Sequence, residues 1–288
     1  MRDLNHDLKV MCRRNRDGSH ATQADRERLL SLNANELHEE GFKNLRATGL
    51  KPKHVQCLID RWKKKGLSAG TIKNRMSAIR WWSEKIGKRN VVARSNDSYG
   101  IERRVFVTNL SKARELKDEE LAKVRDPHTK VSLRLQAAFG LRLEESVKIQ
   151  PTWADRGDHL LLRDSWCKGG KERAVPILDL FQRQVLDEAK ALAGKGSLIP
   201  TKLTYIQQRK RFEYQCDRAG IHRVHGHRHY YAQRRYRDLT GRECPACGGK
   251  TSRQLTKAEK AIDRRARLTI SKEMGHEREQ VTAIYLGR

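Results

Sequence analysis

The sequence predicts a mainly α-helical protein of two domains with one small antiparallel β insert. Apolar residues recur at helical spacing through most of the chain, two short stretches alternate as strands do, and 288 residues suit two domains of roughly 100–200 residues each. We expect a helical domain over residues 21–90, a linker over 91–112 and a second domain over 113–288. Residues 1–20 are polar and basic, and they are expected to form a flexible arm.

The first domain is expected to be a small helical bundle. One helix is predicted over residues 23–37. In residues 54–65, apolar side chains recur at i, i+3, i+4 and i+7, which gives a helix one buried face. Gly66 ends this helix, and Ser68 is placed to cap the next one, whose apolar stripe begins at Ile72.

The second domain is expected to begin with a helix whose acidic first turn follows Lys117. Helices predicted over about 129–139 and 143–149 are separated by Gly140. Two strands are then predicted over 159–163 and 172–177, joined by a Lys-Gly-Gly-Lys turn. The remaining predicted helices span about 179–193, 203–218, 227–239 and 256–273.

The charge of the chain indicates a polyanionic partner. Its 62 Lys and Arg residues against 35 Asp and Glu residues give a net charge of +27, and a polyanion such as nucleic acid relieves the resulting self-repulsion. No apolar run approaches the ~18–20 residues needed to cross a bilayer, and the N-terminus lacks the apolar core of a signal peptide, so membrane and secreted proteins are excluded. Six cysteines in such a chain indicate free thiols in a reducing cytoplasm.

Five short motifs follow one another along the second domain. They are Gly140-Leu141-Arg142-Leu143-Glu144-Glu145, Cys167-Lys168-Gly169-Gly170-Lys171-Glu172-Arg173, His225-Gly226-His227-Arg228-His229, Gly275-His276 and, nine residues further on, Tyr285. Alone, each is more often structural, as an Arg–Glu pair, a solvated hairpin tip or a core histidine. The order of the whole set is therefore more informative than any one motif.

The ordered set of an arginine, a lysine, His-x-x-Arg, a histidine and a tyrosine resembles the tyrosine recombinases, the phage-integrase family, over essentially the whole chain. The resemblance implies a core-binding domain over 21–90 and a catalytic recombinase domain over 113–288. It also implies catalytic roles for Arg142, Lys168, His225, Arg228, His276 and Tyr285. Glu145 is expected to orient Arg142.

The residue types suit the chemistry of DNA strand cleavage. Forked guanidinium donors of Arg142 and Arg228 match the oxygens of a phosphate, and His225 and His276 can add hydrogen bonds and help to move protons. Tyr285 would attack the phosphorus and hold the DNA as a 3′-phosphotyrosyl ester.

Two further expectations concern the leaving group and cofactors. The resemblance implies that Lys168 is the general acid for the leaving 5′-hydroxyl. Glu144 and Glu145 are adjacent and point to different helix faces, so no carboxylate pair for two metal ions is evident. Neither a metal nor another cofactor is expected.

Several alternatives remain open. Tyr230, Tyr231 and Tyr236 are competing nucleophiles, although they are expected to face the core, and Lys171 competes with Lys168. Cys244-Pro245-Ala246-Cys247 resembles half a zinc knuckle, but no second cysteine pair follows, which favours a reduced surface loop in an insert that contacts DNA or a neighbouring protomer.

The resemblance implies that the substrate is a pair of double-stranded DNA recombination sites held by a homotetramer, with an accessory DNA-bending protein as a possible partner. The residues expected to contact the DNA backbone are Lys73, Arg75, Arg80 and Lys171. Integration or excision of a mobile element in a bacterial cytoplasm, near the nucleoid, is the favoured task. The alternatives are an inactive DNA-binding protein of the same fold, a type IB topoisomerase and an RNA-binding protein.

Overall fold

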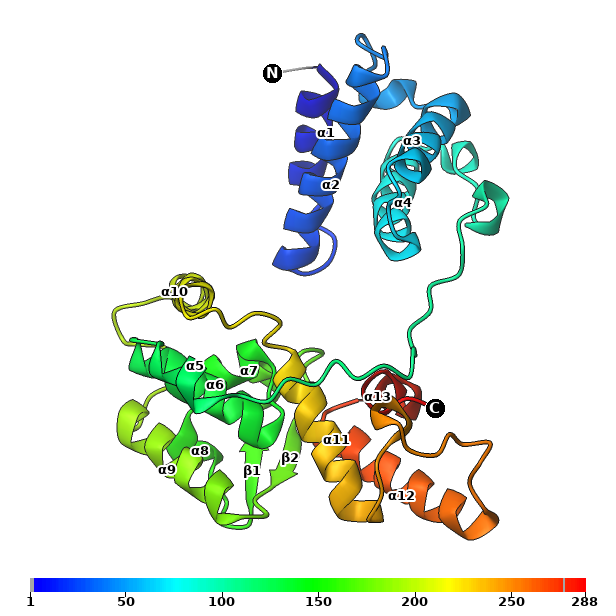
Figure 1. Cartoon of the computed structure of the whole chain (residues 1–288). Coiled ribbons are helices and arrows are strands. Elements are labelled where there is room, and N and C mark those ends of the chain that lie inside the picture. Colours follow the sequence, from blue (N-terminus) through cyan, green and yellow to red (C-terminus); the bar gives the residue numbers. More distant parts are fainter. Residues whose placement is uncertain (1–2, 277) are drawn as a thin grey trace. The chain divides into compact units, whose positions relative to one another are not determined.

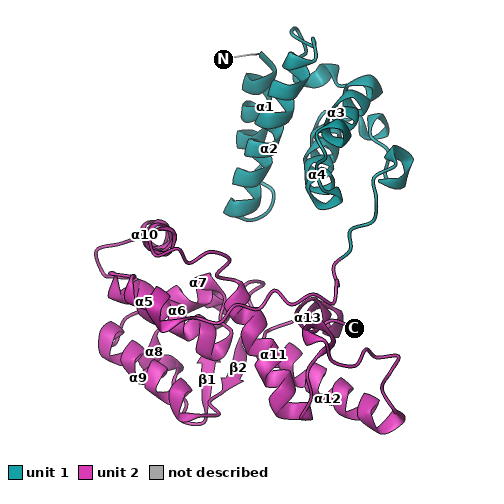
Figure 2. Cartoon of the chain, viewed as in Figure 1, with its two compact units in different colours: residues 1–105 teal, residues 106–288 magenta. Residues whose placement is uncertain are grey.

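The computed structural model describes residues 3–276 and 278–288 and divides the chain into two compact units (Figures 1 and 2). Unit 1 is Met1–Val105 and unit 2 is Phe106–Arg288. The chain is mainly helical with a two-stranded antiparallel sheet, which confirms the predicted fold class. None of the described helices is long and apolar enough to span a membrane.

Unit 1 is built from four α-helices in its described part: α1 (Asp3–Arg14), α2 (His20–Glu39), α3 (Pro52–Lys64) and α4 (Ala69–Lys85). Their apolar faces meet in a core that contains the fully buried indoles of Trp62 and Trp82. Ser68 caps α4 by accepting a hydrogen bond from the Thr71 amide, as predicted. The helices expected within residues 23–37 and 54–65 are confirmed as parts of α2 and α3.

The predicted flexible arm over residues 1–20 is wrong for the described residues of α1. Leu4, Leu8 and Cys12 are buried, and they recur every four residues on the face that packs against α2. This spacing is a helical period carried by few apolar side chains in a polar stretch, and the sequence analysis missed it. Residues 1–2 lie outside the described residues.

The predicted linker over 91–112 is too long. Val92 and Ile101 are buried in the core of unit 1, and the Tyr99 hydroxyl accepts a hydrogen bond from the Ala93 amide. At the other end, Ser111 is hydrogen-bonded within unit 2. Residues 102–112, called the joining segment below, are mostly exposed and contain no helix or strand.

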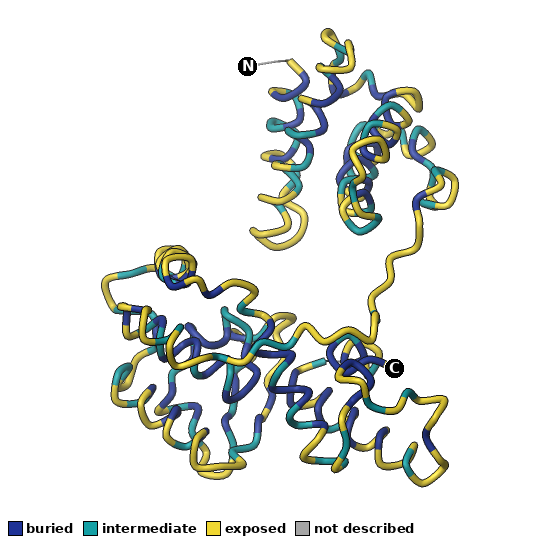
Figure 3. The backbone as a smooth tube through the Cα atoms, viewed as in Figure 1, coloured by how far each residue is buried: buried dark blue, intermediate teal, exposed yellow. Residues whose placement is uncertain are grey.

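Unit 2 is arranged around α11 (Gly226–Thr240). This helix packs on one side against α6 (Pro127–Phe139), and on the other against α12 (Lys257–Glu273) and α13 (Glu279–Leu286) (Figure 1). Much of α11 and α6 is buried, whereas α10 is largely exposed (Figure 3). The other helices of unit 2 are α5 (Asp118–Ala122), α7 (Leu143–Lys148), α8 (Pro151–Ala154), α9 (Leu180–Ala193) and α10 (Tyr205–Arg218).

The predicted hairpin is confirmed as β1 (His159–Leu162) and β2 (Arg173–Pro176). The strands are antiparallel, with Leu162 opposite Arg173. Burial alternates along β2, so Arg173 and Val175 both face inward. Because β2 contacts α12, the inward-facing Arg173 reaches the part of the chain where α12 ends.

Two glycines let side chains from distant parts of the chain approach the backbone closely. Gly140 ends α6 at φ +61°, and a Cβ atom there would lie 2.6 Å from Cδ1 of the buried Tyr231. Gly275 follows α12 at φ +63°, and a Cβ atom would lie 2.9 Å from Cδ of Arg173. At both positions a side chain would be strained by the backbone angle and would also collide with a neighbour.

Candidate functional site

The structure brings five of the six predicted catalytic residues together around Tyr285, which lies on α13 and is only 7% exposed. Its hydroxyl oxygen lies 3.2 Å from Nε2 of His225, the residue just before α11. The ring of His276 stacks on the tyrosine ring with centroids 5.3 Å apart. The guanidinium carbon of Arg228, from α11, lies 5.9 Å from the centre of the same ring.

The fifth residue, Arg142, joins this group through Glu145. Glu145 is fully buried, and its Oε1 accepts a 2.6 Å hydrogen bond from Nη1 of Arg142. Its Oε2 accepts a 2.7 Å hydrogen bond from the Arg142 amide, which fixes the backbone at the start of α7. The predicted contact between Glu145 and Arg142 is therefore present.

Arg173 is a second and more buried partner of Glu145. It donates from Nη1 and Nη2 to the two carboxylate oxygens over 2.8 and 2.7 Å, and from Nε to the Glu273 carbonyl. Burial raises the pKa of Glu145, but the hydrogen bonds and charge of Arg173, with the charges of Arg142 and Arg228, outweigh it and lower the pKa to about 2. Glu145 is ionised at neutral pH.

Arg228 is 1% exposed and is held by backbone oxygens. Its Nη1 donates to the Gly140 carbonyl and its Nη2 to the Met274 carbonyl, while Nε is buried with no partner among the described residues. Burial and repulsion by Arg142 lower its pKa to about 10, so it remains charged at neutral pH. Two guanidiniums, those of Arg142 and Arg173, are thus bonded to the Glu145 carboxylate, and the charge of Arg228 also acts on it. One carboxylate against three guanidiniums leaves an excess of positive charge beside Tyr285.

The two histidines are neutral at neutral pH. Burial and the charges of Arg228 and Arg142 lower the pKa of His225, and the same causes lower that of His276 to about 3. Nδ1 of His276 lies 3.0 Å from the Thr282 hydroxyl, and its Nε2 lies 3.4 Å from Nη2 of Arg228. A neutral imidazole at His225 can accept the proton of the Tyr285 hydroxyl.

Lys168 is not brought to the other five residues. It is exposed on the turn between β1 and β2, and in the described part of the chain no hydrogen bond or ion pair joins it to them. Gly169 and Gly170 follow it at φ +89° and +65°. Its competitor Lys171 is also exposed on this turn. The positions of the two lysines therefore favour neither of them as the general acid.

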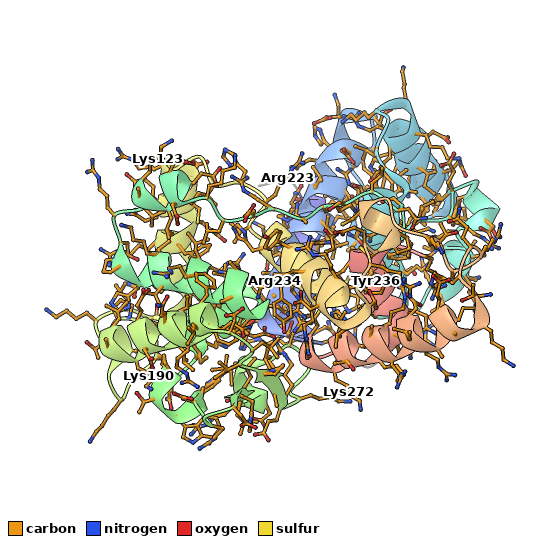
Figure 4. The ribbon with its side chains drawn as sticks, turned by 60° about the horizontal axis from the view of Figure 1, so that its bottom comes forward. Lys123, Lys190, Arg223, Arg234, Tyr236 and Lys272 are labelled. Carbon is orange, nitrogen blue, oxygen red and sulfur yellow. The ribbon has the colours of Figure 1, made fainter. Side chains whose placement is uncertain are left out.

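The competing tyrosines on α11 are directed elsewhere. The hydroxyls of Tyr230, Tyr231 and Tyr236 each donate to a carboxylate, those of Glu115, Glu273 and Asp263 respectively. Burial and these carboxylates raise the pKa of all three tyrosines. Tyr236 lies where α11 meets α12 (Figure 4). The geometry therefore favours Tyr285 as the nucleophile.

The sequence analysis missed two residues of the site. Arg173 belongs to the quoted lysine motif, and alternation along the predicted strand places it on the same face as Val175. His229 is 5% exposed with its ring 4.4 Å from that of Tyr285, and burial and neighbouring positive charges lower its pKa to about 4. The sequence feature that could have identified His229 is its position directly after Arg228 of the His-x-x-Arg motif.

Two of the basic residues predicted to contact DNA from α4 are occupied inside unit 1. Arg75 pairs with buried Glu36 over 3.0 Å, and Arg80 donates to the Ala93 carbonyl and to Asn96. In this structure neither side chain is free for a phosphate, and the expected contact of both with DNA stays a prediction. They lie off the apolar stripe, but they reach buried or backbone acceptors.

The Cys244–Cys247 turn offers no metal site in the part of the chain that the structure describes. No group of three or more His, Cys, Asp or Glu side chains there is placed to hold an ion. Cys244 is buried, and Cys247 donates to Gln233 Oε1 over 3.1 Å. His227 is buried, with Nδ1 2.8 Å from the Arg114 carbonyl, as a core histidine would be.

Two family models match most of the chain. The model described as "Phage integrase, N-terminal" matches residues 1–92, and the one described as "Integrase" matches residues 104–234. No protein with a curated description matches the chain.

Solved structures share the fold at 14–16% sequence identity. A lambda integrase dimer bound to a COC′ core site has a TM-score of 0.63 at 14% identity and covers 99% of this chain and 77% of its own. The Tn1549 transposon integrase in complex with circular intermediate DNA has a TM-score of 0.54 at 16% identity, with 100% and 96% covered. The XerH site-specific recombinase bound to a palindromic difH substrate has a TM-score of 0.59 at 16% identity, with 99% and 81% covered.

The helical unit 1, the helical unit 2 with its hairpin and the matching family models define a tyrosine site-specific recombinase. The chain belongs to the phage integrase family.

Proposed function

We propose that this protein cuts and rejoins duplex DNA through a 3′-phosphotyrosyl intermediate. The observation that carries the proposal is the Tyr285 hydroxyl, 3.2 Å from a neutral His225 and beside a buried cluster of arginines with excess positive charge. Such a cluster suits the scissile phosphate, whose charge increases at the transition state.

Each residue then has a defined task. Arg142 and Arg228 bind the phosphoryl oxygens, and Glu145 and Arg173 hold Arg142 in place. His225 accepts the proton as Tyr285 attacks phosphorus and the bond to the 5′-oxygen breaks. Lys168 protonates that 5′-oxygen, which requires the hairpin turn to close onto bound DNA.

The ester conserves the energy of the broken bond, so a 5′-hydroxyl from another strand can reverse the step without ATP. We extend the proposal to integration or excision of a mobile element by a homotetramer on paired sites, with an accessory DNA-bending protein. Relatives support this extension: one solved structure holds the Tn1549 transposon integrase with circular intermediate DNA, and another a lambda integrase tetramer on a Holliday junction.

A nicked suicide duplex tests the chemistry. The DNA carries the sequence that the protein protects from nuclease digestion, and its nick lets the cleaved end diffuse away, so an adduct accumulates on a denaturing gel. We expect an adduct with wild type, also in the presence of EDTA, and none with Tyr285→Phe, which keeps the ring and loses the hydroxyl.

Other outcomes lead to different conclusions. An adduct that survives Tyr285→Phe would move the nucleophile, most simply to the tyrosines of α11. No adduct on a duplex that is bound would favour the DNA-binding alternative. Relaxation of supercoiled DNA without strand exchange would favour a topoisomerase.

A further inference from the structure

The backbone from Tyr285 to Gly287 is held in place by side chains of other helices. Nε2 of Gln233, on α11, donates to the Tyr285 carbonyl over 2.9 Å. Nη1 of Arg267, on α12, donates to the Gly287 carbonyl over 2.9 Å. An eight-residue helix such as α13 has little stability of its own, so these contacts decide where it lies.

The joining segment supplies a third hold through Asn109. Its Nδ2 donates to the Arg288 carbonyl over 2.9 Å, and its Oδ1 accepts from the Arg288 amide over 2.8 Å. One side chain thus pairs with both backbone groups of one residue. Asn109 adopts φ +51°, a left-handed conformation that asparagine tolerates better than most residues.

Gly287 allows this close approach. A Cβ atom at that position would lie 2.7 Å from Oδ1 of Asn109 and 2.7 Å from the Ala246 amide nitrogen. The chain after α13 is therefore enclosed between the joining segment and the Cys244–Cys247 turn.

Ser111 connects the joining segment to Gln233. Its hydroxyl donates to Oε1 of Gln233 over 3.0 Å, and the amide of the same side chain holds the Tyr285 carbonyl. Gln233 is 6% exposed, so an unmade hydrogen bond there would not be replaced easily by water. We call Asn109, Ser111 and Gln233 the clasp.

We propose that the clasp positions Tyr285 for attack, and that its three members are positioning residues of the reaction. This inference rests on the proposed function. A displacement of about 1 Å between reacting groups can cost roughly 100-fold in rate. Loss of a hydrogen bond at the end of α13 should therefore displace the Tyr285 hydroxyl and slow its attack. Because the chain runs from Asn109 towards unit 1, anything that pulls on the joining segment also acts on the helix that carries Tyr285.

Single-turnover cleavage of the nicked duplex by the full chain, at saturating protein, tests the clasp. Asn109→Gly removes both hydrogen bonds and keeps the left-handed backbone without strain, and Ser111→Ala removes the link to Gln233. We expect the first-order cleavage rate to fall roughly 10- to 100-fold in each, with DNA affinity and unfolding midpoint unchanged. Asn109→Asp keeps only the acceptor for the Arg288 amide and should give an intermediate rate.

Ser197→Ala is the matched control for Ser111→Ala. Both hydroxyls accept a 3.2 Å hydrogen bond from the amide two residues further on, but among the described contacts none joins Ser197 to α11. The control should cleave at the wild-type rate. Hydrogen exchange should also become faster in α13 of Asn109→Gly and stay unchanged in unit 1.

Rates equal to wild type in Asn109→Gly and Ser111→Ala would overturn the clasp, as would equal losses in Ser197→Ala. If the rate falls only in step with DNA affinity or with the unfolding midpoint, the residues are structural and the clasp is also rejected. Failure of the proposed function gives a different pattern, because wild type itself would then form no adduct.

Discussion

At the residue scale, the site depends on Glu145, whose carboxylate is shared between Arg142 and Arg173. A buried guanidinium without a carboxylate partner is costly, and Arg173 has an exposed fraction of only 7%. Glu145 therefore does two things at once: it compensates the charge of Arg173 and fixes the orientation of Arg142.

Glu145→Gln should lower the free energy of unfolding by about 3–5 kcal/mol, because it leaves the Arg173 charge buried without its partner. The pKa of Glu145 falls from 4.5 to about 2 on folding, so its contribution is fully present above pH 4.5 and is lost as pH falls through about 2. Urea unfolding of both proteins at several pH values checks this.

The variant should lack this part of the acid dependence, and its stability should approach that of wild type at the lowest pH. A difference between the two proteins that stays constant from neutral pH to pH ~2 would contradict the role of the charge. Glu144→Gln, on the exposed side of the same helix turn, is the control and should change stability by less than about 1 kcal/mol.

The sequence could predict Arg142, His225, Arg228, His276 and Tyr285 as one site because their motifs follow a known order. It could not predict the partners that hold them. Arg173 meets Glu145 across 28 positions, and Asn109 meets Arg288 across 179, so neither contact leaves a local pattern. Such long-range contacts are decided by the packing of whole elements.

At the element scale, strongly periodic helices and the hairpin were predictable, whereas α1 and α13 were not. α1 has few apolar residues in a polar stretch, and α13 is short and packs against both α11 and α12, so packing rather than sequence period stabilises it. The helix that carries Tyr285 therefore depends on its contacts with α11 and α12 for its stability.

Gly140 and Gly241 test what a helix end contributes to the site. Both follow a helix in the left-handed conformation, at φ +61° and +67°. Gly241→Ala meets no atom within 4 Å and should cost only the ~1–2 kcal/mol of the backbone angle. Gly140→Ala should cost a further ~1–3 kcal/mol, because its Cβ collides with the buried Tyr231 ring.

Chemical denaturation measures the two costs, and the cleavage assay adds a functional readout. The Gly140 carbonyl holds Arg228, so Gly140→Ala should also slow cleavage in the folded fraction, whereas Gly241→Ala should not. If the two variants lose the same free energy of unfolding and cleave at the same rate, the Tyr231 ring moves aside at little cost and the end of α6 does not position Arg228.

At the scale of the whole molecule, the net charge of +27 requires that DNA binding weaken steeply with salt. The sequence could predict this charge but not which cations are available. In unit 1, Arg75 lies against Glu36, which also accepts a 2.6 Å hydrogen bond from the Trp62 indole. Part of the basic composition therefore stabilises the fold instead of facing a partner.

Substitutions of Lys73 and Arg75, two residues apart on α4, distinguish a positive charge that binds DNA from one that stabilises the fold. Arg75→Ala should lower the free energy of unfolding, because it removes the shortest ion pair of a carboxylate that is only 4% exposed, and it should leave the salt dependence of DNA binding unchanged. Lys73→Ala should do the reverse: stability stays within about 0.5 kcal/mol, and the slope of log affinity against log salt falls by about 1, as expected when one phosphate contact is lost. Titrations of wild type and both variants at several salt concentrations, together with urea unfolding, measure both quantities.

A slope that falls in Arg75→Ala would show that the ion pair between Arg75 and Glu36 opens when DNA binds. A slope unchanged in Lys73→Ala would move the DNA-binding face of unit 1 away from α4.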